Sequence, residues 1–170
     1  MRSRFLATTI AALLGTLLSP FFATPALASG DDYLYRTDTT RAADPWGFTK
    51  RQCVSFAAWE LKQRGHPLSN AGNVWGNASH WDDAARAKHL TVTSTPKIGA
   101  IGQWNAGERS VYYPAGGGIG YLQAGAYGHV AVVIRVYADR SVQVAQYNMN
   151  GNRSYSLMHV KAPRYLYLAG

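Results

Sequence analysis

The hydrophobic periodicity of this chain changes once, near Pro96, and this change limits the possible folds more than any other feature of the sequence. Before Pro96, apolar residues recur at helical spacing over residues 52–64 and again after Asn77. After Pro96, apolar and β-branched runs predict strands over residues 98–104, 130–136, 141–147, 155–160 and 165–168. Helices followed by antiparallel strands are typical of an α+β fold, which we therefore predict.

The composition fits one globular domain with a hydrophobic core. The chain has 170 residues, of which 47% are hydrophobic and 15% are charged, so it can bury a sizeable core and is not a disordered chain. Its single cysteine, Cys53, excludes an intramolecular disulfide framework and a zinc cluster built from cysteines. The formal net charge of +8 indicates partners that carry negative charge.

The first residues have the three parts of a secretory signal peptide. Residues 1–4 are basic, residues 5–23 form an apolar run, and residues 26–28 (Ala-Leu-Ala) have the small-x-small pattern that signal peptidase reads. We predict cleavage after Ala28, which makes the protein secreted, extracellular or wall-associated, without a stable membrane anchor. The alternative is an uncleaved anchor, because the run approaches the roughly 20 residues that span a bilayer. Pro20 and the cleavage pattern disfavour that alternative.

These signals divide the chain into three parts. Residues 1–28 are the predicted signal peptide, residues 29–43 are polar and are predicted to be a flexible lead-in, and residues 44–170 are predicted to form one domain. After the signal peptide the sequence has neither a second hydrophobic stretch of spanning length nor an internal repeat. We therefore expect a single exported domain.

Cys53 is unpaired in a chain that we expect to be exported, where no reducing pool protects a thiol, so its presence requires a reason. It stands at the predicted start of the first helix, directly after Lys50, Arg51 and Gln52. The partial positive charge of a helix N-terminus and the two cations would favour thiolate over thiol, as a nucleophile requires. The alternative is a small buried core residue, because free cysteine is among the most buried residue types.

A thiolate nucleophile needs a base, and the sequence offers five histidines. Three of them lie in the helical half of the chain and favour surface or capping roles, and His159 lies near a strand end without an obvious polar partner. His129 opens the apolar strand over residues 130–136, where its ring must face the core or a cleft. By itself such a histidine is more often part of the core than a catalyst.

A hairpin of two consecutive predicted strands gives His129 an amide neighbour. If Val136 pairs with Ser141 across a four-residue loop, His129 lies opposite Asn148, and Gln146 lies at a diagonal position on the same face. The arrangement predicts a nucleophile, a base and an amide that orients the base. A slip of one residue in the register would move both amides to the other face.

The same face of the hairpin is expected to form a floor for the helix that begins near Cys53. The floor residues are Ala131, Val133, Val142 and Val144. Packing of the helix on this floor would bring Cys53 to His129.

Five blocks of this sequence keep the order and spacing of one known family. They are residues 44–59, Trp75-Gly76-Asn77-Ala78 with Trp81, residues 96–104, Gly128-His129-Val130-Ala131, and Gln146-Tyr147-Asn148. In these blocks the chain resembles a CHAP domain, the cysteine- and histidine-dependent amidohydrolase/peptidase family, from about Asp44 to near Leu168. The resemblance implies a papain-like α+β fold, with N-terminal helices packed on an antiparallel sheet. By this resemblance Cys53 is the nucleophile and His129 the general base of a CHAP-like catalytic domain.

The resemblance also implies a substrate and a reaction. The substrate is bacterial peptidoglycan, and the reaction is hydrolysis of its amide bonds. The bond cut is either the one between muramic acid and L-alanine, as in an amidase, or one within the stem peptide or cross-bridge, as in an endopeptidase.

One block departs from the family pattern, because this chain has Gln146-Tyr147-Asn148 where the family often has Glu-x-Asn. A neutral amide oxygen can accept from the imidazole N–H and hold its tautomer, but it cannot neutralise an imidazolium. We expect an active enzyme with a less stabilised thiolate–imidazolium pair. The alternative is a catalytically weak or silent module that binds the cell wall.

Residues 105–127, rich in glycine and tyrosine, are predicted to be a mobile loop that walls the substrate groove, with an ordinary surface loop as the alternative. A phosphate-binding loop is disfavoured, because no Gly-Lys-Ser/Thr follows the glycines. The predicted substrate contacts are Tyr127 and Gly128 at the end of this segment, and Trp104 just before it.

The remaining predictions concern cofactors and partners. We predict no metal and no cofactor, because the carboxylates lack calcium-loop spacing and the histidines lack a paired zinc motif. Peptidoglycan and anionic wall polymers suit the basic charge. Nucleic acid is disfavoured, since the basic residues are scattered and form no known binding motif. We expect a monomer.

Overall fold

The computed structural model describes residues 30–169, so the predicted signal peptide over residues 1–28 lies outside the described residues. Within the described part, the helices are α1 (Cys53–Gln63), η1 (Ala71–Asn73), η2 (Ala78–His80) and α2 (Trp81–Ala87). The strands are β1 (Thr91–Thr93), β2 (Ile101–Trp104), β3 (Arg109–Tyr112), β4 (Gly120–Gln123), β5 (His129–Val136), β6 (Val142–Tyr147), β7 (Tyr155–Val160) and β8 (Arg164–Tyr167). None of the helices between residues 30 and 169 has the length and apolar character needed to cross a membrane.

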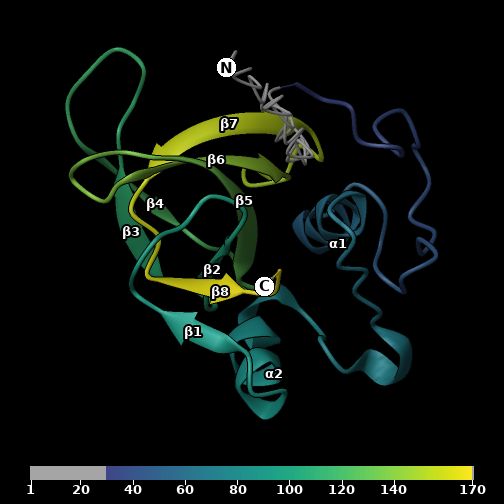
Figure 1. Ribbon diagram of the computed structural model, residues 1–170. Helices are drawn as coiled ribbons and strands as arrows, with labels where there is room; N and C mark the ends of the chain where they lie inside the picture. Colours follow the sequence, from purple (N-terminus) through teal and green to yellow (C-terminus); the bar gives the residue numbers. More distant parts are fainter. Residues whose placement is uncertain (1–29, 170) are drawn as a thin grey trace, which may run out of the picture.

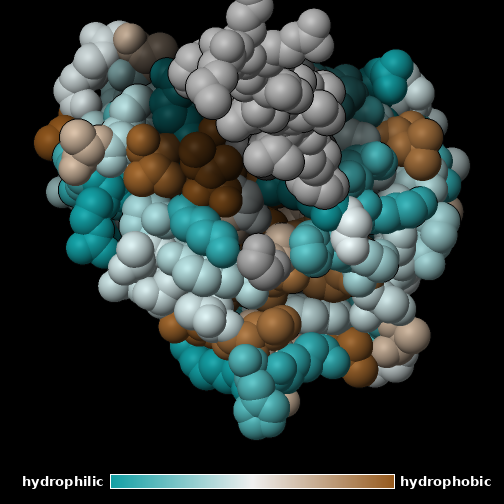
Figure 2. Space-filling view, viewed as in Figure 1, coloured by the Kyte–Doolittle hydropathy of each residue, from teal (hydrophilic) through white to brown (hydrophobic). Residues whose placement is uncertain are grey.

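All the strands join one antiparallel sheet in the order β1-β8-β2-β5-β6-β7-β3-β4. The sheet curls, with β6 and β7 arching along one side and β1 and β8 at the other (Figure 1). Helix α1 packs against β5 and β6, and α2 packs against β1. The predicted α+β, papain-like fold, with helices first and an antiparallel sheet after them, is confirmed. On the face seen in Figure 2, apolar residues form separate patches among polar ones.

Helix α1 begins and ends where the sequence predicts. Gln52, just before it, has an extended backbone with φ −101° and ψ 158°. Gly65, just after it, has φ +80°, a conformation that favours glycine. The N–H of Gly65 donates to the Lys62 carbonyl at 3.0 Å and the N–H of His66 to the Leu61 carbonyl at 2.9 Å, which closes the last turn. The glycine thus forms the C-terminal stop of the helix.

The β5–β6 hairpin has the predicted register on one side only. Val132 pairs with Ala145, as predicted. A bulge midway along β5 then shifts the register, so that Val136 pairs with Val142 and not with the predicted Ser141. The prediction is wrong near the loop, because the bulge places one additional residue in β5.

Helix α1 packs on the opposite face of β5 from the predicted one. Its apolar side forms one buried cluster with Val130 and Val132 of β5 and Tyr147 of β6. The four predicted floor residues belong instead to a second buried cluster, on the other face of the sheet: Ala131, Val133, Val142 and Val144. Because both faces of β5 are buried, its continuous apolar run does not tell which face meets the helix.

Residues 30–43 pack into the core, although the sequence predicts a flexible lead-in there. Tyr33 is fully buried, and its ring centroid lies 4.9 to 5.7 Å from the rings of Phe56, Trp59 and Tyr147. This anchored segment, residues 30–43, is called the N-terminal strap below. Its polar composition conceals the aromatic side chains, Tyr33 and the partly buried Tyr35, that tie it to the domain.

The segment predicted to be a mobile loop, residues 105–127, contains a β-hairpin. Strands β3 and β4 pair from Arg109 with Gln123 to Tyr112 with Gly120, and β3 continues the sheet beyond β7. Each strand has only four residues, and the glycines between them hide the alternation that would indicate a strand. The prediction of a loop is therefore wrong for the two strands, Arg109–Tyr112 and Gly120–Gln123.

Candidate active site

One cleft, with a volume of about 720 Å³, brings together side chains from distant parts of the chain. Its walls come from Arg41 and from within residues 47–54, 70–78, 125–129 and 148–151. Cys53, at the start of α1, and His129, at the start of β5, both line it. The predicted nucleophile and base therefore share one cleft.

A buried carboxylate, Asp44, fixes the turn that precedes α1. Its Oδ1 accepts the backbone N–H groups of Trp46 and Phe48, both at 2.9 Å, and its Oδ2 accepts the Ser55 hydroxyl at 2.5 Å. The hydroxyl of Tyr33, from the strap, lies 2.5 Å from the same Ser55 oxygen. Because Ser55 lies in the first turn of α1, these hydrogen bonds hold the helix end that carries the cysteine.

Burial raises the pKa of the Cys53 thiol to about 11. Backbone N–H groups, the one on Val130 first among them, hydrogen-bond to the sulfur and lower the pKa only in part. The two cations near it in sequence are engaged elsewhere, because Lys50 pairs with the Asp38 carboxylate at 2.8 Å and Arg51 donates to the Asp38 carbonyl at 3.3 Å. The expectation that helix end and cations favour thiolate is wrong for the resting site.

Burial also lowers the pKa of the His129 imidazole to about 4, and a hydrogen bond with the Gln146 side chain raises it only in part. The ring is 4% exposed, and its Nε2 is buried without a hydrogen-bond partner among the described residues. The amide itself is held, because its Oε1 accepts the Met149 N–H at 2.9 Å and its Nε2 donates to the Ser156 hydroxyl. Gln146 is therefore the amide that the structure brings to the histidine.

The resting site is neutral at neutral pH. With a cysteine pKa of about 11 and a histidine pKa of about 4, the sulfur keeps its proton and the imidazole remains free to accept one. This arrangement fits a proton transfer that accompanies attack on a carbonyl carbon, and not a preformed ion pair.

Asn148 faces the residue before the cysteine. Its Nδ2 donates to Gln52 Oε1 at 2.6 Å, and its Oδ1 accepts the Arg153 backbone N–H at 2.7 Å. Its φ of +65° ends the alternation of β6, so the prediction that places its side chain against His129 does not hold. Gln52 also lines the cleft, and sequence analysis passed over it although it directly precedes the cysteine.

Two of the three predicted substrate contacts line the cleft. Tyr127 is 71% exposed there, and Gly128 follows it with φ +71°. A Cβ at Gly128 would lie 2.5 Å from the Trp104 carbonyl oxygen, so no other residue fits. Trp104 itself is 1% exposed, donates its indole N–H to Ser110, and lies 5.8 Å from the His129 ring between centroids. It supports the histidine from the core, and its predicted role as a substrate contact is wrong.

The other four histidines do not line this cleft. The three in the helical half are exposed. His159 packs between the rings of Tyr113 and Tyr137, at 4.4 and 4.2 Å, and its Nε2 lies 2.6 Å from the Ser141 hydroxyl. That hydroxyl also bonds Asp139 and is fully buried, so this group has no nucleophile that a substrate can reach.

Across residues 30–169 no three His, Cys, Asp or Glu side chains are grouped so that they could hold a metal ion. That the site works without a metal or cofactor stays a prediction.

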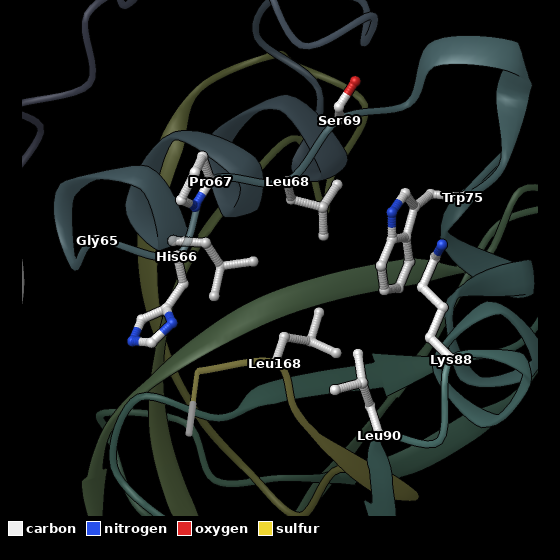
Figure 3. A pocket seen from close by; sticks show the side chains of 10 residues that line it. Gly65, His66, Pro67, Leu68, Ser69, Trp75, Lys88, Leu90 and Leu168 are labelled. Carbon is white, nitrogen blue, oxygen red and sulfur yellow. The ribbon is translucent and has the colours of Figure 1, made fainter.

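A second cavity, of about 480 Å³, lies at the C-terminal end of α1, whereas Cys53 is at the N-terminal end. Figure 3 shows leucine side chains from three segments turned toward it, with Trp75 and Lys88 on one side and His66 on the other. Neither a cysteine nor a carboxylate lines it, so the candidate chemistry stays in the first cleft.

Comparison with known proteins places these residues in a family. Residues 43–148 match the CHAP domain family, and this range contains the cysteine, the histidine and both amides of the site. Over 77 residues the chain is 39% identical to the staphylococcal secretory antigen SsaA and 40% identical to the antigen ssaA2, both of Staphylococcus aureus. These alignments cover 45% of this chain and 23% or 22% of the relatives, so the chain matches about a quarter of their length.

A solved structure has a similar fold. It is the crystal structure of an N-acetylmuramoyl-L-alanine amidase from Staphylococcus aureus, with a TM-score of 0.53 and 26% sequence identity. The similarity covers 81% of this chain and 37% of the amidase chain.

Proposed function

Because the chain belongs to the CHAP domain family, we propose that it is a secreted cysteine hydrolase that cleaves amide bonds of bacterial peptidoglycan. One observation carries the proposal: Cys53 and His129, from elements far apart in sequence, line one cleft. The name of the solved neighbour favours the bond between muramic acid and L-alanine.

The proposed reaction begins with the neutral pair. His129 accepts the Cys53 proton as the sulfur attacks the substrate carbonyl carbon, and the carbonyl oxygen takes up negative charge. Backbone N–H groups at the start of α1 stabilise that oxygen. The imidazolium then gives its proton to the leaving amine, and the C–N bond breaks to leave a thioester.

Water completes the reaction. His129 takes a proton from the water as its oxygen attacks the thioester carbon, and the C–S bond breaks to release the acid and restore the thiol. Gln146 orients the imidazole through its side-chain contact, and Asn148 fixes Gln52, the residue that precedes the nucleophile.

Mass spectrometry tests the whole proposal. Protein recovered from the culture medium is expected to have the mass of a chain that begins at Ser29. Incubated with purified peptidoglycan, this protein should release new fragments, whose masses separate cleavage next to muramic acid from cleavage within the stem peptide. Cys53→Ser should release none while keeping its circular dichroism spectrum, because the hydroxyl of serine is a much weaker nucleophile than the thiol.

The matched control is His66→Ala, which changes an exposed histidine at the other end of α1 and should release the same fragments as wild type. If wild type and Cys53→Ser both sediment with the wall and neither releases fragments, the protein is a wall-binding module and not a hydrolase.

A further inference from the structure

The charge of the active-site cleft is one-sided. Among the residues that line the cleft, Arg41 is charged, His129 is neutral at neutral pH, and none is an aspartate or a glutamate. The remaining polar lining is mostly neutral, and its amides are Gln52, Asn70, Asn73, Asn77 and Asn148. The lining thus offers a substrate one fixed positive charge and several neutral donors and acceptors.

The backbone on both sides of Arg41 is held in place. The Thr40 carbonyl accepts the Arg153 Nη2 at 2.6 Å, and the Ala42 carbonyl accepts the Lys50 N–H at 3.1 Å. The side chain of Arg41 is nevertheless exposed. The backbone therefore fixes where this side chain starts, and the exposed guanidinium is free to reach a ligand in the cleft.

No carboxylate compensates this charge. Among the ion pairs between residues 30 and 169, Lys50 pairs with Asp38, whereas Arg41, Arg51 and Arg153 take part in none. Arg51 and Arg153 donate to backbone carbonyls, and the Nε of each is buried without a partner. Three guanidinium groups near one end of the cleft therefore lack a negative partner.

We propose that Arg41 binds a carboxylate of the substrate, so that this site prefers stem peptides with a free carboxylate over the same peptides with that carboxylate amidated. The inference rests on the proposed function, which supplies a peptide amide as the reacting bond. A guanidinium can pair with both oxygens of a carboxylate, whereas an amide offers it one neutral oxygen and two N–H groups that it cannot accept. Arg41 then selects substrates by charge rather than by the chemistry at the sulfur.

The test uses a set of soluble muramyl pentapeptides: the unmodified peptide and versions in which one carboxylate at a time is amidated. Because the peptides are soluble and carry no wall polymer, the charge of the wall does not influence the result. For wild type we expect one amidated member to lose about tenfold in kcat/KM, mainly through KM, because a charge-assisted pair is lost. Arg41→Gln should lower kcat/KM for the unmodified peptide by the same factor. This variant should therefore cleave the unmodified peptide and its amidated version equally well. Arg41→Lys should keep part of the preference, because it keeps the charge.

Arg36→Gln is the matched control, because it removes the same charge from an exposed arginine of the same strap that does not line the cleft. It should keep the wild-type preference. A wild type that does not distinguish any amide, or an Arg41→Gln variant that keeps the preference, would overturn the inference.

Binding separates this inference from the proposed function. Calorimetry with Cys53→Ala measures the affinity for each peptide whether or not the wild type cleaves it. Suppose that wild type cleaves no peptide, but that Cys53→Ala binds the unmodified peptide about tenfold more tightly than its amidated version. If adding Arg41→Gln abolishes this difference in affinity, the hydrolase proposal fails and the carboxylate site stands. Equal binding of all the peptides would overturn the carboxylate site.

Discussion

The side chain of Gln146 decides how far the buried His129 ring can be charged. A neutral amide offers the imidazolium a dipole, so burial dominates and the pKa falls to about 4. A carboxylate at the same place would offer a full charge, with Coulomb attraction strengthened by the low-dielectric surroundings. Burial and the residue at position 146 therefore set together the acid end of the pH range in which the imidazole accepts a proton.

Gln146→Glu should shift the acid limb of the kcat/KM profile to higher pH by about one unit or more. The imidazole accepts a proton only when it is neutral, so activity is present above its pKa and is lost as the pH falls through that value. In wild type the loss is expected near pH 4, which is the pKa to which burial lowers His129. Hydrolysis rates of a soluble muramyl peptide between pH 3 and pH 8 would measure the acid limb of each of the two proteins.

Gln143→Glu is the control for that shift, because it adds the same charge to β6 at a position that alternates to the other face. Its acid limb should stay with that of wild type. If Gln146→Glu also left the limb in place, the contact between amide and ring would have no role in titration.

Single residues of the site were predictable to different degrees. Cys53 and His129 stand out because a lone thiol in a chain with a predicted signal peptide and a histidine that opens an apolar strand are both costly without a role. Asn148 was misplaced because a positive φ ends the strand alternation one residue earlier than the pattern indicates. Arg41 carries no local signal, since its place in the cleft depends on hydrogen bonds from Lys50 and Arg153, far along the chain.

At the scale of elements, the N-terminal strap supports the end of α1. Its Tyr33 joins the aromatic cluster of the core and places its hydroxyl against Ser55 and the Arg51 N–H, at 2.5 and 3.3 Å. Burial raises the pKa of this hydroxyl, so it stays protonated and can donate at any physiological pH. The strap thus acts on the helix through one buried hydroxyl and one ring.

Tyr33→Phe should lower the free energy of unfolding by about 1 kcal/mol, because it keeps the ring and removes a buried hydrogen bond. Urea denaturation followed by circular dichroism measures this difference. Tyr35→Phe, on the same strap, should change it little, since the structure shows no hydrogen bond from that half-buried hydroxyl. Equal effects of the two changes would mean that the buried hydroxyl of Tyr33 does not stabilise the fold.

Elements were predictable where one pattern had one structural meaning. The helix predicted over residues 52–64 and the strand predicted over residues 155–160 have clear periodicity and clear ends, and both are confirmed. The face of β5 that meets α1 was not predictable, because a strand buried on both faces has no polar side to orient it. The β3–β4 hairpin was missed because four-residue strands are too short to show alternation among glycines.

At the scale of the whole molecule, a buried neutral histidine links folding to pH. Unfolding returns His129 to water and to its ordinary pKa of 6.5, whereas in the folded protein the pKa is about 4. Between these values the unfolded chain binds a proton that the folded protein does not bind. The contribution of the neutral His129 to the free energy of unfolding is therefore complete above pH 6.5 and is lost as the pH falls toward 4.

Acidification from pH 7 to pH 4 should cost wild type about 3 kcal/mol more in unfolding free energy than it costs His129→Gln. Glutamine is neutral at both pH values, so the difference between the two proteins cancels the contributions of the other titrating groups. Urea denaturation at the two pH values provides the four free energies. The same loss in both proteins would show that His129 is not the group that links stability to pH.

The protonated resting thiol also affects how long the protein can remain useful. Peroxides and disulfides react with thiolate, and at pH 7 a thiol with a pKa of about 11 is ionised in about one molecule in ten thousand. The raised pKa therefore protects Cys53 against oxidative damage. In the proposed reaction the sulfur loses its proton only when a substrate carbonyl and His129 draw it away, so chemical durability and catalysis come from the same protonated sulfur.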